Sequence, residues 1–127
     1  MRVLVVDDSK ISRELIMMHL RSIGIENIDT AEDGVDAIGK ITKLPKNTKY
    51  DVIMLDVVMP RKNGLATLKD IKQLTPESKI IICSSLHDSQ TVKIALGFGV
   101  NGYIIKPFTK EKLLEAFWYS LKIHSEV

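Results

Sequence analysis

The chain has 127 residues, 45% of them hydrophobic, and a formal net charge of +2 at pH 7. This length is typical of one globular domain, and so mild a positive charge does not indicate nucleic-acid binding, which usually appears as a concentrated basic stripe. No apolar run approaches the roughly 20 residues of a membrane span, and no signal peptide precedes the first apolar run. The single Cys83 lies in an apolar run and is typical of a core residue in a reducing compartment. We therefore expect a soluble, cytoplasmic protein without direct nucleic-acid or membrane contacts.

Apolar runs of strand length alternate with longer segments of helical period, which predicts βαβ units and a parallel sheet. We expect strands near residues 2–6, 27–31, 51–55, 79–83 and 102–105. We expect helices near residues 10–23, 34–42, 64–74, 88–98 and 110–123. The polar connection 44–49 predicts a solvated loop whose lysines serve solubility rather than ligand binding.

Two helices carry apolar residues at helical spacing, and we expect these residues to face the core. They are Ile11, Leu15, Met18 and Ile23 in the first helix, and Leu113, Phe117 and Leu121 in the last. Leu114, Trp118 and Tyr119 of the last helix would then lie outside the core, where an apolar and aromatic patch suggests a partner or dimer surface. The alternative is that Trp118 packs on a neighbouring helix.

Charged residues follow three of the predicted strands. Asp7 and Asp8 follow the first strand, Asp56 follows the third, and Lys106 follows the fifth. The carboxyl ends of neighbouring parallel strands meet in one crevice, so these side chains should converge there. Two unit charges ~4 Å apart repel by about 4 kcal/mol at an effective dielectric constant of 20, so three carboxylates need a cation. A hard divalent cation suits them, and Mg²⁺ is the first choice.

Each of these features alone also fits an ordinary role. The pair Asp7–Asp8 could cap a helix, Ser84–Ser85 could form a cap or a turn, and an isolated Lys106 would be solvated. The turn after the first strand contains no glycine, so it does not match the Gly-rich phosphate loops of Rossmann or P-loop proteins. The acidic pair, the two serines and the lysine favour a functional site because all of them follow the carboxyl ends of predicted strands.

Five features in chain order resemble the receiver domain of two-component response regulators, and the length is similar to the single-domain chemotaxis type. The resemblance covers essentially the whole chain, so we expect one receiver domain over residues 1–127. It implies a flavodoxin-like, doubly wound α/β fold with five helices and a five-stranded parallel sheet of order 2-1-3-4-5. The features are Asp7-Asp8, Asp56 to Pro60, Gly64, Ser84-Ser85 and Lys106-Pro107-Phe108, together with Glu32-Asp33-Gly34 after the second strand.

The resemblance implies a phosphoacceptor and a metal site. Asp56 would be the nucleophile that forms an acyl phosphate. Asp8 would bind Mg²⁺ directly, and Asp7 would act mostly through water. Asp56 and the backbone carbonyl of Val58 would complete the protein ligands. The phosphodonor would be the phosphohistidine of a sensor histidine kinase.

The resemblance also implies a switch. Lys106 and Ser84 would bind phosphoryl oxygens, and the Lys106–Pro107 bond would be cis. On activation Ser84 would move toward the phosphoryl group and Tyr103 would turn inward; alternatively Tyr103 is a strand aromatic with a solvated hydroxyl. The shifted population would present the face of helix 4, strand 5 and helix 5 to an unknown downstream protein, from a monomer or a weak phosphorylation-dependent dimer.

Val58 and Leu86 occupy two positions that tune phosphoryl lifetime in this family. Their side chains cannot position an attacking water, so we expect slow autodephosphorylation. The chain would then catalyse its own phosphorylation without being a conventional enzyme. The alternatives are the receiver part of a DNA-binding regulator, a receiver that signals by binding alone, and a haloacid dehalogenase-type phosphatase, whose Asp-x-Asp pattern is missing at Asp7-Asp8-Ser9.

Overall fold

The computed structural model describes residues 1–58 and 64–122. Five parallel strands form one sheet of order β2-β1-β3-β4-β5, which confirms the predicted topology. The strands are β1 (Arg2–Val6), β2 (Asn27–Ala31), β3 (Val52–Leu55), β4 (Lys79–Ser84) and β5 (Gly102–Ile105). The helices are α1 (Lys10–Arg21), α2 (Gly34–Thr42), α3 (Gly64–Leu74), α4 (Ser89–Gly97) and α5 (Lys110–Lys122).

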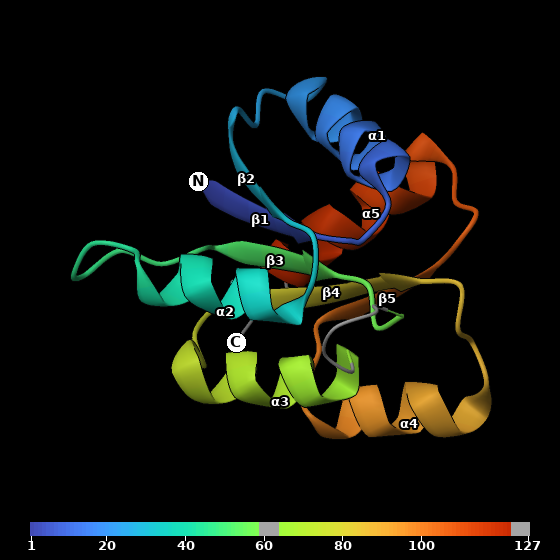
Figure 1. Cartoon of the computed structure of the whole chain (residues 1–127). Helices are drawn as coiled ribbons and strands as arrows, with labels where there is room; N and C mark the ends of the chain where they lie inside the picture. Colours follow the sequence, from blue (N-terminus) through green and yellow to red (C-terminus); the bar gives the residue numbers. More distant parts are fainter. Residues whose placement is uncertain (59–63, 123–127) are drawn as a thin grey trace.

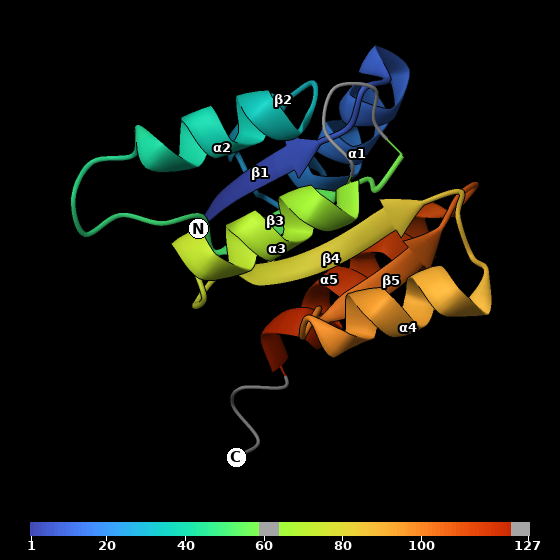
Figure 2. The same ribbon diagram turned by 60° about the horizontal axis from the view of Figure 1, so that its bottom comes forward.

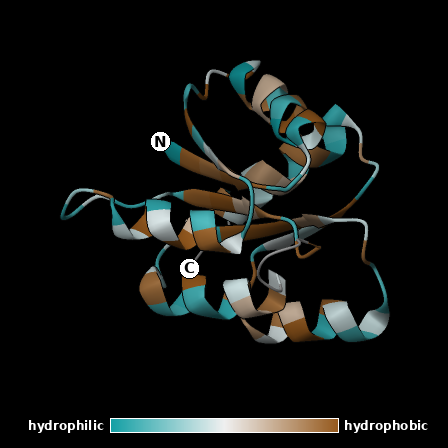
Figure 3. Ribbon diagram, viewed as in Figure 1, coloured by the Kyte–Doolittle hydropathy of each residue, from teal (hydrophilic) through white to brown (hydrophobic). Residues whose placement is uncertain are grey.

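The helices cover both faces of the sheet. Helices α1 and α5 lie on one face, and α2, α3 and α4 lie on the other (Figures 1 and 2). Each face has its own core, because successive strand residues point to opposite sides. Leu4 and Ile53 belong to the core under α2–α4, whereas Val5 and Met54 belong to the core under α1 and α5. Hydrophobic residues accordingly dominate the central strands (Figure 3).

The predicted element bounds are correct to within two residues over the described part of the chain. Helix α1 ends at Arg21 rather than near residue 23, because the chain turns at Gly24 with φ of +90°. Asp51 precedes β3, and its carboxylate accepts a hydrogen bond from the Arg2 N–H at 2.8 Å. Of the predicted features, Pro60 lies outside the described residues, as does residue 123 at the predicted end of the last helix.

Helices α1, α2 and α4 begin with side-chain caps, and Thr109 caps α5 in the same way. The carboxylate or hydroxyl of Ser9, Asp33 and Asp88 accepts a hydrogen bond from the backbone N–H three residues on, at 3.2, 2.8 and 3.0 Å. Such caps satisfy N–H groups that the first helical turn leaves unpaired. Helix α1 is therefore capped by Ser9, and the interpretation of Asp7–Asp8 as a cap is wrong.

The buried face of α1 differs from the predicted one. Ile16 and Leu20 are buried, whereas Ile11 is 80% exposed and Met18 is 57% exposed. Leu15 also lies on the exposed side, at 38%. Of the predicted stripe, Ile23 packs against the core from the turn after the helix. The helix has two apolar stripes, and the sheet covers the stripe that contains Ile16 and Leu20 instead of the predicted one.

Helix α5 buries the predicted stripe of Leu113, Phe117 and Leu121. The first two side chains are fully covered, and the third packs against the same core from a partly buried position. Periodicity therefore gives the correct orientation for this helix.

The predicted surface of α5 is confirmed in two of its three residues. Trp118 and Tyr119 are 48% and 59% exposed, as expected for residues outside the core. Leu114 is different, because it is partly buried and packs against the core. Of the three, only the two aromatic residues therefore remain as an exposed patch.

Candidate functional site

The order of the strands brings the three acidic residues together. Strands β1 and β3 are neighbours at the centre of the sheet, and Asp7, Asp8 and Asp56 follow their carboxyl ends. One oxygen from each carboxylate lies within 4.8 Å of the others. Asp7 and Asp56 are buried, at 1% and 5% exposure, whereas Asp8 is exposed. The convergence expected from the sequence is therefore present.

Lys106 reaches this cluster from the end of β5, two strands away from β3. Its ammonium lies 2.6 Å from Asp7 Oδ2 and 3.0 Å from Asp56 Oδ2, so it bridges the two buried carboxylates. It also donates to the hydroxyl of Ser12 at 3.3 Å. Only 19% of its side chain is exposed, so the alternative of a solvated lysine is wrong. The predicted cis bond between Lys106 and Pro107 is present.

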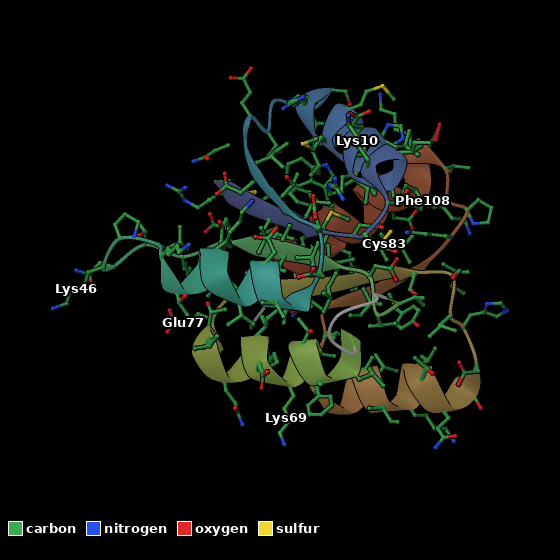
Figure 4. The ribbon with its side chains drawn as sticks, viewed as in Figure 1. Lys10, Lys46, Lys69, Glu77, Cys83 and Phe108 are labelled. Atoms are coloured by element: carbon green, nitrogen blue, oxygen red, sulfur yellow. The ribbon has the colours of Figure 1, made fainter. Side chains whose placement is uncertain are left out.

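Burial and charge change the acidity of these groups. Burial raises the pKa of Asp7 above its usual value, and the hydrogen bond from Lys106 only partly opposes this. Burial alone would lower the pKa of Lys106, but the hydrogen bonds to Asp7 and Asp56 and the negative charges of these two carboxylates together raise it. The lysine is therefore held in its charged form beside Asp56. Cys83, which Figure 4 labels, is a buried residue of β4, and burial raises the pKa of its thiol to about 12.

Backbone N–H groups hold the two buried carboxylates in place. Ser9 N–H donates to Asp7 Oδ1, and Val58 N–H donates to Asp56 Oδ1, both at 2.9 Å. Arg13 donates to the backbone carbonyl of Asp7 at 2.8 Å. The sequence analysis did not identify Arg13, or Ser12, which contacts Lys106. Both residues lie in the first turn of the helix that follows the acidic pair, and this position could have indicated them.

Gly64 allows the segment after Asp56 to pack closely. A Cβ atom built on Gly64 would lie 2.1 Å from the Cα atom of Val57, a separation that no real side chain tolerates. Helix α3 therefore begins directly against the backbone of the residue that follows Asp56. A side chain at position 64 would displace this backbone and with it the Asp56 carboxylate.

The two predicted switch residues contact the same residue, Leu86. Ser84 is buried, and its hydroxyl accepts a hydrogen bond from the Leu86 N–H at 3.2 Å. The hydroxyl of Tyr103 donates to the backbone carbonyl of Leu86. The Tyr103 hydroxyl is therefore bonded to the segment that follows β4, and the turn expected as the ordinary role of Ser84 is present.

A groove of about 880 Å³ runs along the edge strand β5 and the start of α5. Its lining includes Tyr103, Lys106, Phe108 and Tyr119. Trp118 precedes Tyr119 in the sequence, and its ring packs edge-on against the neighbouring Phe117 with centroids 5.5 Å apart. The groove is thus lined both by Lys106 of the charged cluster and by the exposed Tyr119 of α5.

A family model of the response regulator receiver domain matches residues 3–117. The chain belongs to this family. The chemotaxis protein CheY of Treponema pallidum is 38% identical over 121 residues, covering 95% of this chain and 83% of the relative. CheY of Bacillus subtilis is 35% identical over 115 residues, covering 91% and 92%.

Solved structures agree with this assignment. The structure of a CheX–CheY–BeF3–Mg²⁺ complex from Borrelia burgdorferi superposes with a TM-score of 0.88 at 31% identity, covering 94% of this chain and 88% of that chain. The receiver domain described here is thus homologous to CheY response regulators, proteins of chemotaxis and two-component signalling. These relatives do not favour the DNA-binding regulator or the phosphatase. Among the described residues, no helix combines the length and apolar content needed to cross a membrane.

Proposed function

We propose that this receiver domain accepts a phosphoryl group on Asp56 from the phosphohistidine of a sensor kinase. A carboxylate oxygen of Asp56 attacks phosphorus, the P–N bond breaks, and the imidazole nitrogen leaves with the bonding electron pair. The observation that carries the proposal is the Lys106 ammonium, held 3.0 Å from Asp56 by a second buried carboxylate, Asp7. The pair places a fixed cation where charge develops on the phosphoryl oxygens.

The residues around Asp56 suit a magnesium ion. Asp7, Asp8 and Asp56 offer oxygen ligands only, which is the donor set of a hard cation. Asp8 makes no hydrogen bond to any described residue, so its carboxylate is available to bind the ion directly. When bound, Mg²⁺ supplies charge neutralisation for the transferred phosphoryl group. The Val58 carbonyl as a further ligand stays a prediction.

The switch follows from the contacts of Ser84. A phosphoryl group on Asp56 adds acceptor oxygens at the end of β3, next to the end of β4. A movement of the Ser84 side chain toward an oxygen of this group would lengthen or break the hydrogen bond that its hydroxyl accepts from the Leu86 N–H. The Leu86 carbonyl also accepts a hydrogen bond from the Tyr103 hydroxyl. A shift of Leu86 would therefore change both the loop before α4 and the edge strand β5. We propose that a downstream protein reads this change at Tyr119 and Trp118.

Partners and location are part of the same proposal. The phosphodonor is a sensor histidine kinase, and the domain acts as a monomer or a weak dimer that forms on phosphorylation, without direct nucleic-acid or membrane contacts. A cytoplasmic location is supported by the unpaired, buried thiol of Cys83. The domain catalyses its own modification and is not a conventional enzyme.

The phosphoryl group should be long-lived on this domain. Val58 and Leu86 are 45% and 40% exposed, and their apolar side chains offer no hydrogen bond to an attacking water. Loss of label from the phosphorylated protein over minutes to hours is the expected result. A half-life of seconds would contradict this part of the proposal.

Intact-protein mass spectrometry after incubation with acetyl phosphate tests the phosphoacceptor. We expect a gain of one phosphoryl group in wild type with Mg²⁺, and none without it or in Asp56→Asn. Lys106→Met should slow the gain roughly 100-fold, since loss of one donor to developing charge costs about that much. Lys110→Met, at an exposed lysine of α5, is the matched control and should be unchanged. Equal phosphorylation of wild type and Asp56→Asn would overturn the proposal.

A further inference from the structure

A second cavity lies at the opposite end of the sheet from Asp56. It has a volume of about 580 Å³ and opens beside the amino ends of β4 and β5. Lys79, the first residue of β4, and Asn101, directly before β5, contribute to its wall. Its volume lies in the range of roughly 300–1,000 Å³ that is usual for small-molecule sites.

Three lysines line this cavity, and one of them, Lys79, has no counterion among the described residues. Lys79 is 8% exposed, and no carboxylate of the described residues forms an ion pair with it. The stem of Lys79 is covered, while its ammonium remains accessible at the cavity wall. Burial, followed by the charges of Lys49 and Lys72, lowers the pKa of Lys79. An anion in the cavity would supply the missing partner.

The other lysines approach from separate elements. Lys72 comes from α3, and its ammonium lies 3.7 Å from the position that a Cβ atom on Gly99 would take, so it extends toward the turn before β5. Lys49 comes from the loop before β3, for which the sequence predicted only a solubilising role. The Asn101 side-chain oxygen already accepts from the Ile80 N–H at 3.0 Å, which leaves its amide nitrogen as a donor.

The cavity also contains two carboxylates, and neither forms an ion pair with Lys79. Asp51 is engaged by the Arg2 N–H at 2.8 Å, and Glu77 is exposed in the turn after α3 (Figure 4). Three lysines against these two acids leave one net positive charge on the wall. Pro76 and Leu121 add apolar surface beside the charged groups.

We infer that this cavity binds a phosphate-bearing small molecule of nucleotide size, with its phosphate at Lys79, Lys72 and Lys49. Lysine binds phosphate as a point charge and Asn101 adds a neutral donor. The apolar wall at Pro76 and Leu121 accommodates a ring. This site is separate from Asp56 and independent of the phosphorylation proposed there.

An NMR titration of the ¹⁵N-labelled protein with AMP, at constant ionic strength and without Mg²⁺, tests the inference. We expect saturable shifts of the Ser78, Lys79 and Asn101 amides with a Kd below about 1 mM. Adenosine, which lacks the phosphate, should give no saturable shift of these amides at the same concentrations.

Variants make the test specific. Lys79→Met keeps an apolar stem at the buried position, and Lys72→Gln, at a half-exposed site, guards against a folding defect in the first variant. Each should weaken AMP binding roughly tenfold or more. Lys46→Gln is the matched control, because Lys46 projects from the loop between α2 and β3, outside the cavity (Figure 4). Shifts that do not saturate, equal affinity in all variants, or shifts confined to Asp56 and Lys106 would overturn the inference.

Discussion

The hydroxyl of Tyr103 donates a hydrogen bond to the backbone carbonyl of Leu86. The N–H of the same leucine donates to the Ser84 hydroxyl at 3.2 Å. Leu86 therefore connects the serine at the end of β4 with the aromatic residue on the edge strand. A change at Ser84 reaches Tyr103 through one residue of backbone, which is a short path from Asp56 to the groove along β5.

Removing the Tyr103 hydroxyl should loosen this loop. A typical hydrogen bond contributes about 1 kcal/mol to stability, so Tyr103→Phe should lower the free energy of unfolding by about that amount. Urea denaturation measures the difference. Tyr119→Phe is the control, because its exposed hydroxyl has no hydrogen-bond partner among the described residues. An equal effect of both substitutions would mean that the contact with Leu86 contributes nothing.

Magnesium should stabilise the folded domain. An ion that binds only the native state at 100 times its Kd adds about 2.7 kcal/mol to the free energy of unfolding. We expect Tm to rise with added Mg²⁺ in wild type and not in Asp8→Asn, which loses the exposed carboxylate of the cluster. Glu115→Gln, an exposed acid on α5, should retain the full rise. Identical rises in all three proteins would exclude the acidic cluster as the binding site.

Asp7 should make stability fall as pH rises in the acid range. Its folded-state pKa is raised above 3.8 by burial, so the native state binds the proton more tightly than the unfolded state. The resulting stabilisation is complete below pH ~3.8 and is lost as pH rises through the folded pKa.

Asp7→Asn has no proton to lose at this position. The free energy of unfolding of the variant, measured without Mg²⁺, should therefore rise relative to wild type across this window, by at most about 1.4 kcal/mol per pH unit. Urea titrations from pH ~3.5 upward provide the comparison. A difference that stays constant or falls with pH would contradict the burial argument.

The two apolar stripes of α1 should respond differently to substitution. Ile16 is 1% exposed, so Ile16→Ala should cost about 2–5 kcal/mol through lost burial and a cavity. Ile11 is 80% exposed, so Ile11→Ala should change stability by less than about 0.5 kcal/mol. Urea denaturation of both variants tests the orientation of the helix, and the reverse order of effects would show that the predicted stripe faces the core after all.

The fold could be predicted because apolar runs of strand length alternate with segments of helical period, the pattern of an α/β fold. The orientation of α1 could not be predicted from the sequence. Residues 11, 15 and 18 and residues 16, 20 and 23 both repeat at helical spacing, so periodicity alone gives two solutions. Tertiary packing selects the second, since Ile16 and Leu20 meet the sheet.

The site was predictable where a charge follows a strand, because parallel strands deliver those residues to one edge. Asp7, Asp56 and Lys106 meet as expected. The Lys106 contact with Ser12 depends on the angle at which α1 leaves β1, which no local pattern encodes. The same holds for the contact between Tyr103 and the Leu86 carbonyl, because a backbone acceptor has no sequence signature.

Chemical trapping of the phosphorylated residue tests the central claim most directly. Borohydride reduces an acyl phosphate on aspartate to homoserine, and peptide mass spectrometry then locates the modified position. After phosphorylation with acetyl phosphate and Mg²⁺, we expect homoserine at position 56. Homoserine at Asp7 or Asp8, or a phosphoryl group that survives borohydride on another residue, would contradict it.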